Sequence, residues 1–229
     1  MKTVCVVQHI EAEYLGLIED HFEGRNIRFR YLRPFTPGGA LPEAVGDFDA
    51  LMLLGAGPYG LVSGHILPSA GHELRLARAF LDAGRPVLGL GLGAVVLAVA
   101  AGGGAEEAPL RFRVETARAV RPGALGGHLP ERFPLAVYLR DAPVPPPGAE
   151  ILATREDGAP LVFSVAENSL GFVGHPGMKR GMAEDVVMEF VETPPDTAEA
   201  LAALGRAQAE IAAALSAIMV GASARMGLM

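Results

Sequence analysis

One short stretch has the residue pattern of a turn that presents a catalytic nucleophile. An apolar run, Val87 to Leu90, is typical of a buried strand, and good helix formers fill residues 94–101. Glycines at positions 89, 91 and 93 permit a sharp turn between the two elements. A strand, a tight glycine turn and a helix form a nucleophile elbow, whose turn residue carries the attacking side chain. Here that residue is Gly91, so the pattern predicts the turn without its nucleophile.

The same stretch resembles the active-site motif of class I glutamine amidotransferase domains, usually written P-V-L-G-I-C-x-G-x-Q. Residues Pro86 to Gly89 and Gly93 fit this motif, whereas the family's cysteine falls on Gly91 and its glutamine on Val95. The resemblance covers roughly residues 3–180. It implies a three-layer, flavodoxin-like α/β fold, with a mainly parallel central sheet flanked by helices.

Two earlier segments add to the resemblance. Val6 to Gly16 is similar to the opening of one amidotransferase subfamily, and residues 55–58 (Gly-Ala-Gly-Pro) resemble its G-G-P loop. In the family, this loop and the residue after the nucleophile supply two N–H groups to an oxyanion hole. The corresponding residues here are Gly57 and Leu92. Because both donors are main-chain groups, loss of the cysteine would not remove them.

His175 and the residues around it complete the resemblance. Gly174-His175-Pro176-Gly177 is similar to the family's H-P-E element, in which the histidine is the general base and the glutamate orients it. His175 is retained, but the glutamate falls on Gly177. A histidine before a proline is by itself an ordinary loop residue, and the matching elbow upstream favours a relic of the triad base. The family's H-x-D element is represented by Leu139-Arg140-Asp141, without the histidine.

These replacements predict that glutaminase activity has been lost. Glutamine hydrolysis needs a thiolate nucleophile, a base and an orienting carboxylate, and the chain offers Gly91, His175 and Gly177 in their places. The first hypothesis is therefore a non-catalytic binding or regulatory subunit of a larger enzyme of the synthetase or ligase type. Whether the chain is an enzyme stays open, because a different reaction in the same cleft is an alternative.

Two alternatives use the same cleft for something else. An enzyme with different chemistry would use His9, Glu11, His65 and His175, if they cluster, as metal ligands or as acid and base. No H-x-x-x-H or comparable spacing is present, so we predict no metal and no other cofactor. A small-molecule sensor would bind glutamine or a related amide or amino acid through the backbone N–H groups of Gly57 and Leu92.

Strands alternate with helices in the first half of the chain, which predicts a parallel sheet with helices on both faces. We expect strands over 4–7, 27–32, 50–54 and 87–90, and helices over 15–21 and 72–83. In the second half we expect strands within 110–120, an irregular segment over 122–134, and short antiparallel strands over 151–154, 161–165 and 170–174.

The C-terminal region predicts a helical extension. We place a glutamine amidotransferase-like domain over 1–192 and the extension over 193–229, with one long helix over 198–219. Its apolar residues recur at three- and four-residue spacing, interrupted by Gln208, and form a stripe. The stripe packs either on its own domain or on a partner, which includes a homodimer formed through this helix.

Composition excludes several classes of function. The net charge of −7 and a pI near 5.4 argue against nucleic-acid binding, which needs a basic surface. The only cysteine, Cys5, lies in an apolar run and implies no disulfide and no oxidising compartment. We expect no signal peptide, because the N-terminus lacks a basic region, an apolar core and a cleavage site. We expect no transmembrane helix, because no uninterrupted apolar segment reaches 18 residues. These features predict a cytoplasmic protein of one α/β domain.

Overall fold

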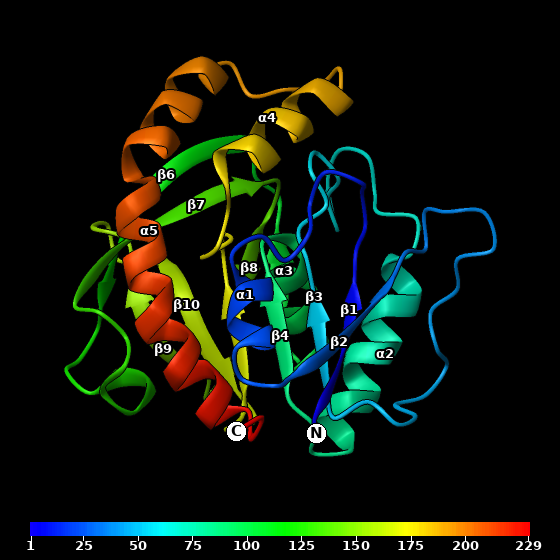
Figure 1. The fold of residues 1–229 in the computed structure, drawn as a ribbon. Coiled ribbons are helices and arrows are strands. Elements are labelled where there is room, and N and C mark those ends of the chain that lie inside the picture. Colours follow the sequence, from blue (N-terminus) through cyan, green and yellow to red (C-terminus); the bar gives the residue numbers. More distant parts are fainter.

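A nine-stranded mixed sheet forms the centre of the molecule in the computed structural model, which describes residues 1–229 (Figure 1). Its strand order is β2-β1-β3-β4-β11-β10-β9-β6-β7. The strands are β1 (Thr3–Val7), β2 (Arg28–Leu32), β3 (Ala50–Leu53), β4 (Val87–Leu90), β6 (Arg111–Ala119), β7 (Arg132–Leu139), β9 (Glu150–Thr154), β10 (Pro160–Val165) and β11 (Ser169–Phe172). A separate two-stranded ribbon pairs β5 (Gly104–Glu106) with β8 (Ala142–Val144).

The sheet confirms the predicted α/β fold class. Five adjacent strands, β2-β1-β3-β4-β11, are parallel to one another, and the remaining four are joined by antiparallel pairings. Following these pairings across the sheet, only β10 and β6 run against the common direction. The predicted half-exposed strand over 27–32 is the edge strand β2.

Two expectations for the second half need correction. The strand predicted over 170–174 as antiparallel is β11, which pairs antiparallel with β10 but parallel with β4. The hairpin from β10 returns the chain to the open side of β4, so β11 joins the parallel half. The segment 122–134, predicted to be irregular, ends inside β7, whose residues from Phe133 to Leu139 are all buried.

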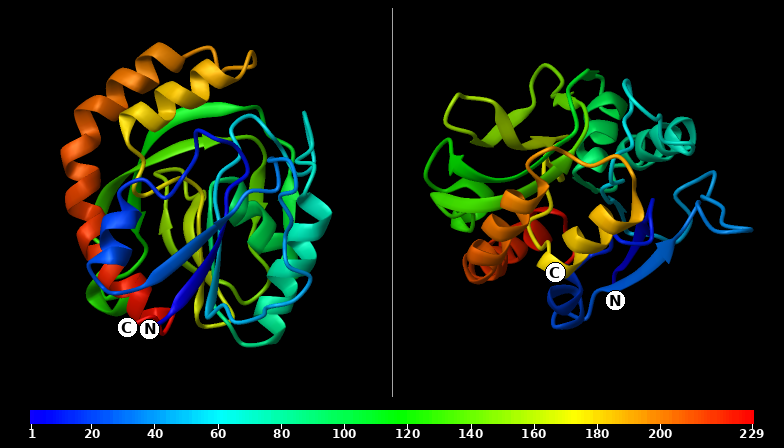
Figure 2. Two further views of the ribbon diagram at one scale, coloured as in Figure 1. Left: turned by 45° about the vertical axis from the view of Figure 1, so that its right-hand side comes forward. Right: turned by 90° about the horizontal axis from the view of Figure 1, so that it is seen from above.

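Helices cover both faces of the sheet (Figure 2). They are α1 (Ile18–Glu23), α2 (Ala70–Asp82), α3 (Leu92–Ala100), α4 (Arg180–Glu189), α5 (Thr197–Arg225) and the 3-10 turn η1 (Ala124–Gly127). Helices α2 and α3 pack on one face, where Leu76 and Leu97 meet Leu51 of β3 in one core cluster. Helices α1 and α5 pack on the other, where Ile18 and Leu215 share a second cluster.

Helix α5 lies along β6 and β7 and contacts α4, α1 and η1 (Figure 1). The predicted stripe is buried within the chain at Leu204, Ile211, Leu215 and Ile218. Its polar member, Gln208, accepts a hydrogen bond from the N–H of Arg180 (2.9 Å) and donates one to the carbonyl of Met178 (3.1 Å). The division of the chain at residues 192 and 193 stays a prediction.

By length and composition alone, α5 would be able to cross a membrane, contrary to the expectation that no segment would qualify. This single helix is weak support for a membrane span, because core helices of globular domains pass the same test. The cytoplasmic location stays a prediction.

Substitution of Leu215 tests how much the packing of α5 contributes to the stability of the fold. We expect Leu215→Ala to lower the free energy of unfolding by about 2–5 kcal/mol, because it removes a fully buried side chain and leaves a cavity beside α1. Urea unfolding followed by circular dichroism measures the change. Ser216→Ala, on the exposed side of the same turn, is the control and is expected to change stability by less than about 0.5 kcal/mol. Equal effects of the two substitutions would contradict this packing.

Candidate functional site

The turn between β4 and α3 is sharp and is built from backbone. Gly91 has φ 55° and ψ −120°, a conformation that strains any residue with a side chain. Its N–H donates to the carbonyl of Phe172 (2.9 Å), and the N–H of Gly93 donates to the carbonyl of Leu54 (3.1 Å). A Cβ placed on Gly91 would lie 3.4 Å from the Cα of Gly55, which is ordinary contact. The position has room for the first atom of a side chain, and the chain has none there.

Two further glycines bring α3 against the sheet. A Cβ on Gly93 would overlap the carbonyl of Leu53, and one on Gly89 would overlap the carbonyl of Gly93. Val95, where the family has glutamine, is fully buried in the core. The three glycines therefore serve two purposes, because Gly91 allows the turn and the other two allow close packing.

His175 follows β11, the neighbour of β4, and is buried. Its Nε2 donates to the carbonyl of Tyr14 (2.9 Å), and its Nδ1 accepts from the N–H of Gly177 (3.1 Å). A carbonyl only accepts and an amide N–H only donates, so the ring is the neutral Nε2–H tautomer. Burial lowers the pKa of His175 to about 4. The one lone pair with which this ring would take a proton is already occupied.

The position of the family's glutamate is crowded. A Cβ on Gly177 would lie 3.1 Å from the Cγ1 of Ile18 and 3.2 Å from the Cδ2 of Leu215, which is tighter than ordinary contact. A side chain at this position would require the side chains of Ile18 and Leu215 to shift by a few tenths of an ångström. In its absence, the backbone N–H of Gly177 orients His175.

The carboxylate of Glu13, which is not among the predicted site residues, binds the N–H of Gly57, one of the two predicted donors. The Oε2 of Glu13 accepts a hydrogen bond from the N–H of Gly57 at 2.6 Å, and its carboxylate fills the space above Gly55. Burial raises the pKa of Glu13 to about 7. The other predicted donor, Leu92, is the first residue of α3, so its N–H has no acceptor within the helix.

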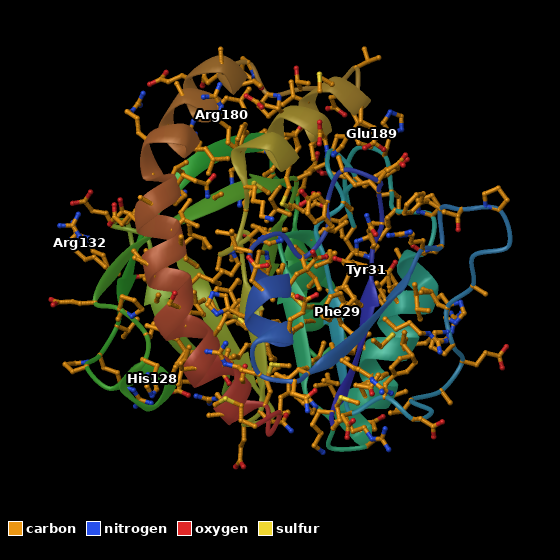
Figure 3. The ribbon with its side chains drawn as sticks, in the orientation of Figure 1. Phe29, Tyr31, His128, Arg132, Arg180 and Glu189 are labelled. Carbon is orange, nitrogen blue, oxygen red and sulfur yellow. The ribbon has the colours of Figure 1, made fainter.

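The surroundings of Glu13 are closed and mostly apolar. Phe190 and Ile10 each lie 3.1 Å from where a Cβ on Gly57 would be. The hydroxyl of Tyr138 is buried without a hydrogen-bond partner, and burial, together with the charge of Glu13, raises the pKa of Tyr138 to about 12. Glu189, labelled on α4 in Figure 3, accepts from the N–H of Ala12 (3.3 Å) and adds a second negative charge near Glu13.

The segment that carries Glu13 is fixed at its far end by β2. The hydroxyl of Tyr31, labelled in Figure 3, accepts from the N–H of Leu15 (3.0 Å) and donates to Glu19 (2.5 Å). Leu17 then donates from its N–H to the carbonyl of Gly177 (3.0 Å). Both contacts hold the chain between β1 and α1 against the candidate site.

His9 is held in a separate buried ion pair. Its Nε2 lies 2.7 Å from Oε2 of Glu73 on α2, its Nδ1 lies 2.9 Å from the carbonyl of Gly55, and both side chains are fully buried. Burial alone would lower the pKa of His9, but the Glu73 carboxylate and the Gly55 carbonyl outweigh it and raise that pKa. Burial likewise opposes ionisation of Glu73, yet His9 and the hydroxyl of Ser69 (2.5 Å) lower its pKa.

The predicted cluster of His9, Glu11, His65 and His175 does not form. His9 and His175 have separate buried partners, whereas Glu11 and His65 are exposed at the surface. No group of three or more His, Cys, Asp or Glu side chains is arranged to hold a metal ion. The grouping on which the alternative of an enzyme with different chemistry depended is therefore absent, because the loops direct the two buried imidazoles to different neighbours.

Asp141, in the segment aligned with the family's H-x-D element, fixes a loop. It is buried with φ 63°, and its carboxylate accepts from the N–H groups of Leu61 (2.7 Å) and Val62 (2.9 Å). Burial opposes ionisation, but these bonds and one from Ser63 lower the pKa of Asp141. Arg140 beside it donates from Nε to the carbonyl of Pro58 (3.0 Å).

The architecture matches solved structures of glutamine amidotransferases. One from Methylobacillus flagellatus aligns over 98% of this chain and 95% of its own, with a TM-score of 0.83 and 23% identity. Another from Thermotoga maritima aligns over 98% of both chains, with a TM-score of 0.79 and 21% identity. A candidate GMP synthase component from Thermoplasma acidophilum aligns over 92% of this chain and 98% of its own, with a TM-score of 0.61 and 15% identity.

The chain has the glutamine amidotransferase fold. Comparison of the sequence with models of protein families and with curated proteins gives no match, so the likeness lies in the structure. Within this fold, Gly57, Gly91 and His175 follow β3, β4 and β11, whose carboxyl ends adjoin. Their roles as donor, vacant nucleophile position and relic base stay predictions. The only sequence signal for Glu13 is its place in the segment 6–16 that resembles a subfamily opening.

Glu13 predicts a dependence of stability on pH. Its pKa is about 7 in the folded chain and near 4.5 when exposed, so the wild type loses stability as pH rises between these values and does not regain it above pH 7. Relative to wild type, Glu13→Gln should gain stability over the same range, by roughly 3 kcal/mol at pH 8. Urea unfolding at pH 5 and pH 8 measures the gain.

The exposed neighbour Glu11 supplies the control for this experiment. Glu11→Gln is expected to leave the free energy of unfolding unchanged within about 0.5 kcal/mol at both pH values. A Glu13→Gln variant with the same gain at pH 5 and pH 8 would contradict the buried, proton-binding carboxylate.

Proposed function

We propose that this chain is a glutamine amidotransferase-like protein that lacks glutaminase activity and serves as a non-catalytic binding or regulatory subunit of a larger enzyme. The observation that carries the proposal is Gly91, which stands at the strained turn between β4 and α3 without a side chain to attack an amide. The only thiol cannot substitute for it, because Cys5 lies within β1 and burial raises its pKa to about 12.

The remaining parts of the site support the same conclusion. The lone pair of His175 accepts a hydrogen bond from Gly177, and residue 177 has no carboxylate to orient the ring. The N–H of Gly57, which would stabilise an oxyanion, is held by Glu13. Each of these groups would have to be released before a thiol at position 91 would have a base and an oxyanion donor.

Exposed apolar side chains beside the site support a protein partner. Met188 (75% exposed) and Val191 (105%) lie at the end of α4, and Val62 and Ile66 (49% each) lie on the loop after β3. Exposed large apolar side chains such as methionine are common at the centres of protein interfaces. The apolar stripe of α5 is buried within the chain, so we place the partner at the end of α4 instead of on α5.

One observation favours a different chemistry in the same place, as the second candidate function. Glu13 is a buried carboxyl with a pKa near 7 beside the unpartnered hydroxyl of Tyr138, a combination found at acid–base sites. A sensor for amides is less well supported, because Glu13 already occupies the N–H of Gly57.

An assay of glutamine hydrolysis shows whether the chain lacks only the nucleophilic cysteine or also a free base and oxyanion donor. We expect no ammonia above background from the wild type, and none from Gly91→Cys, because the base and the donor are both engaged. A coupled ammonia assay at pH 8 measures this. Hydrolysis by the wild type would refute the loss of activity, and hydrolysis by Gly91→Cys that disappears in Gly91→Cys/His175→Ala would show that only the cysteine is missing.

Substitutions at the end of α4 test whether this surface binds a partner enzyme. A Met188→Asp/Val191→Asp double variant should lose at least tenfold in affinity for an enzyme that co-purifies with the wild-type chain and whose activity the chain changes. The control is Val120→Asp, because Val120 is also exposed but follows β6, away from α4. Equal loss in both variants, or a monomer that changes no enzyme's activity, would count against the subunit role.

A further inference from the structure

A cavity of about 350 Å³ lies between the central sheet and the β5–β8 ribbon with the segment that follows β5. Its lining includes the buried side chains of Val137, Leu161 and Val173 and the three prolines Pro109, Pro143 and Pro160. None of these residues takes part in the site described above. A mostly apolar cavity of this size with a few polar groups is typical of a small-molecule site.

Arg111 of β6 presents an incompletely paired guanidinium to this cavity. The group is half-buried, and its one hydrogen bond is a long one to the carbonyl of Asp141 (3.4 Å). It has no carboxylate within ion-pair distance. A guanidinium has five N–H donors, and removing it from water without a counter-charge is costly.

The second arginine of the cavity, Arg155, already has carboxylate partners. Arg155 is paired with Asp157 and lies 3.5 Å from Glu115. Burial and the positive charge of Arg155 together lower the pKa of Arg111, and Glu115 offsets this only in part. The lining is neutral as a whole, because Glu106 and Glu115 offset the two arginines, but the guanidinium of Arg111 itself has no carboxylate partner for a ligand to compete with.

We propose that this cavity binds a small monocarboxylic acid, with its carboxylate on Arg111 and its apolar body against the proline-lined wall. The planar fork of a guanidinium matches a carboxylate in a bidentate arrangement. Glu106 and Glu115 also line the cavity, so their charges disfavour an anion with two charges, such as a phosphate, more than a monocarboxylate. The apolar lining selects acids that carry a hydrocarbon body over acetate.

Asp141 links Arg111 to the loop that follows β3. The carbonyl of Asp141 accepts from Arg111, and its side chain holds Leu61 and Val62. Asp141 has φ 63°, a strained conformation for a residue with a side chain. Occupation of Arg111 is therefore expected to alter the environment of the Leu61 and Val62 amides as well as that of the Val137 and Val173 methyl groups.

The test compares phenylacetate with its neutral isostere phenylacetamide by isothermal titration calorimetry at pH 7.5. We expect saturable binding of phenylacetate with a Kd below about 1 mM and at least tenfold weaker binding of the amide. Arg111→Gln should weaken phenylacetate binding at least tenfold. Arg113→Gln is the control, because Arg113 lies on the same strand, is exposed and does not line the cavity. It should stay within twofold of the wild type.

Arg111→Lys keeps the charge and loses the fork, so it provides a second variant if Arg111→Gln unfolds, and an intermediate affinity is expected. In two-dimensional NMR of the wild type, phenylacetate should shift the Val137 and Val173 methyl signals. The absence of saturable binding up to about 20 mM, equal binding of acid and amide, or unchanged binding in both Arg111 variants would overturn the proposal.

Discussion

The buried ion pair between His9 and Glu73 holds together the segments on which the candidate site is built. It joins the chain after β1 to helix α2, and the second ring nitrogen of His9 binds the carbonyl of Gly55 after β3. Two charges removed from water are tolerated only where each has partners of good geometry. The loop after β3 is thereby fixed on one side by His9 and on the other by Asp141, with Gly57 between them.

Two polar groups of the candidate site, the ring of His175 and the N–H of Gly57, are satisfied by hydrogen bonds within the chain. An active site keeps its donors and its base free for the substrate, and so leaves them poorly satisfied when it is empty. Here the backbone of Tyr14 and Gly177 saturates His175, and Glu13 takes the N–H of Gly57. Such an arrangement favours a stable scaffold and agrees with a role in binding other molecules.

Glu13 and Arg111 show the opposite feature in two separate places. Each is an ionisable group withdrawn from water with too few partners, and burial shifts the pKa of each toward its neutral form. Neither is needed to form the sheet, since the core clusters on both faces consist of apolar side chains. Groups of this kind cost stability, and for that reason they are the places where function is most reasonably sought.

The sequence alone determined the fold class and the glycine turn on which the candidate site is built. Apolar runs such as Val4 to Val7 and the glycine turn at Gly91 are local patterns, so the parallel strands and the turn after β4 were predictable from neighbouring residues. The burial of most of the α5 stripe also followed its local periodicity, although only the tertiary structure showed that it packs within the chain.

Only the tertiary structure decided which side chains meet. Glu13 and Gly57 are 44 residues apart, His9 and Glu73 are 64 apart, and Gly177 meets both α1 and α5. These contacts depend on strand order and on how closely backbones approach, which local patterns do not contain. For the same reason the separate environments of His9 and His175 were not foreseen, the parallel pairing of β11 with β4 was missed, and neither the carboxylate at Gly57 nor the cavity at Arg111 was visible in the sequence.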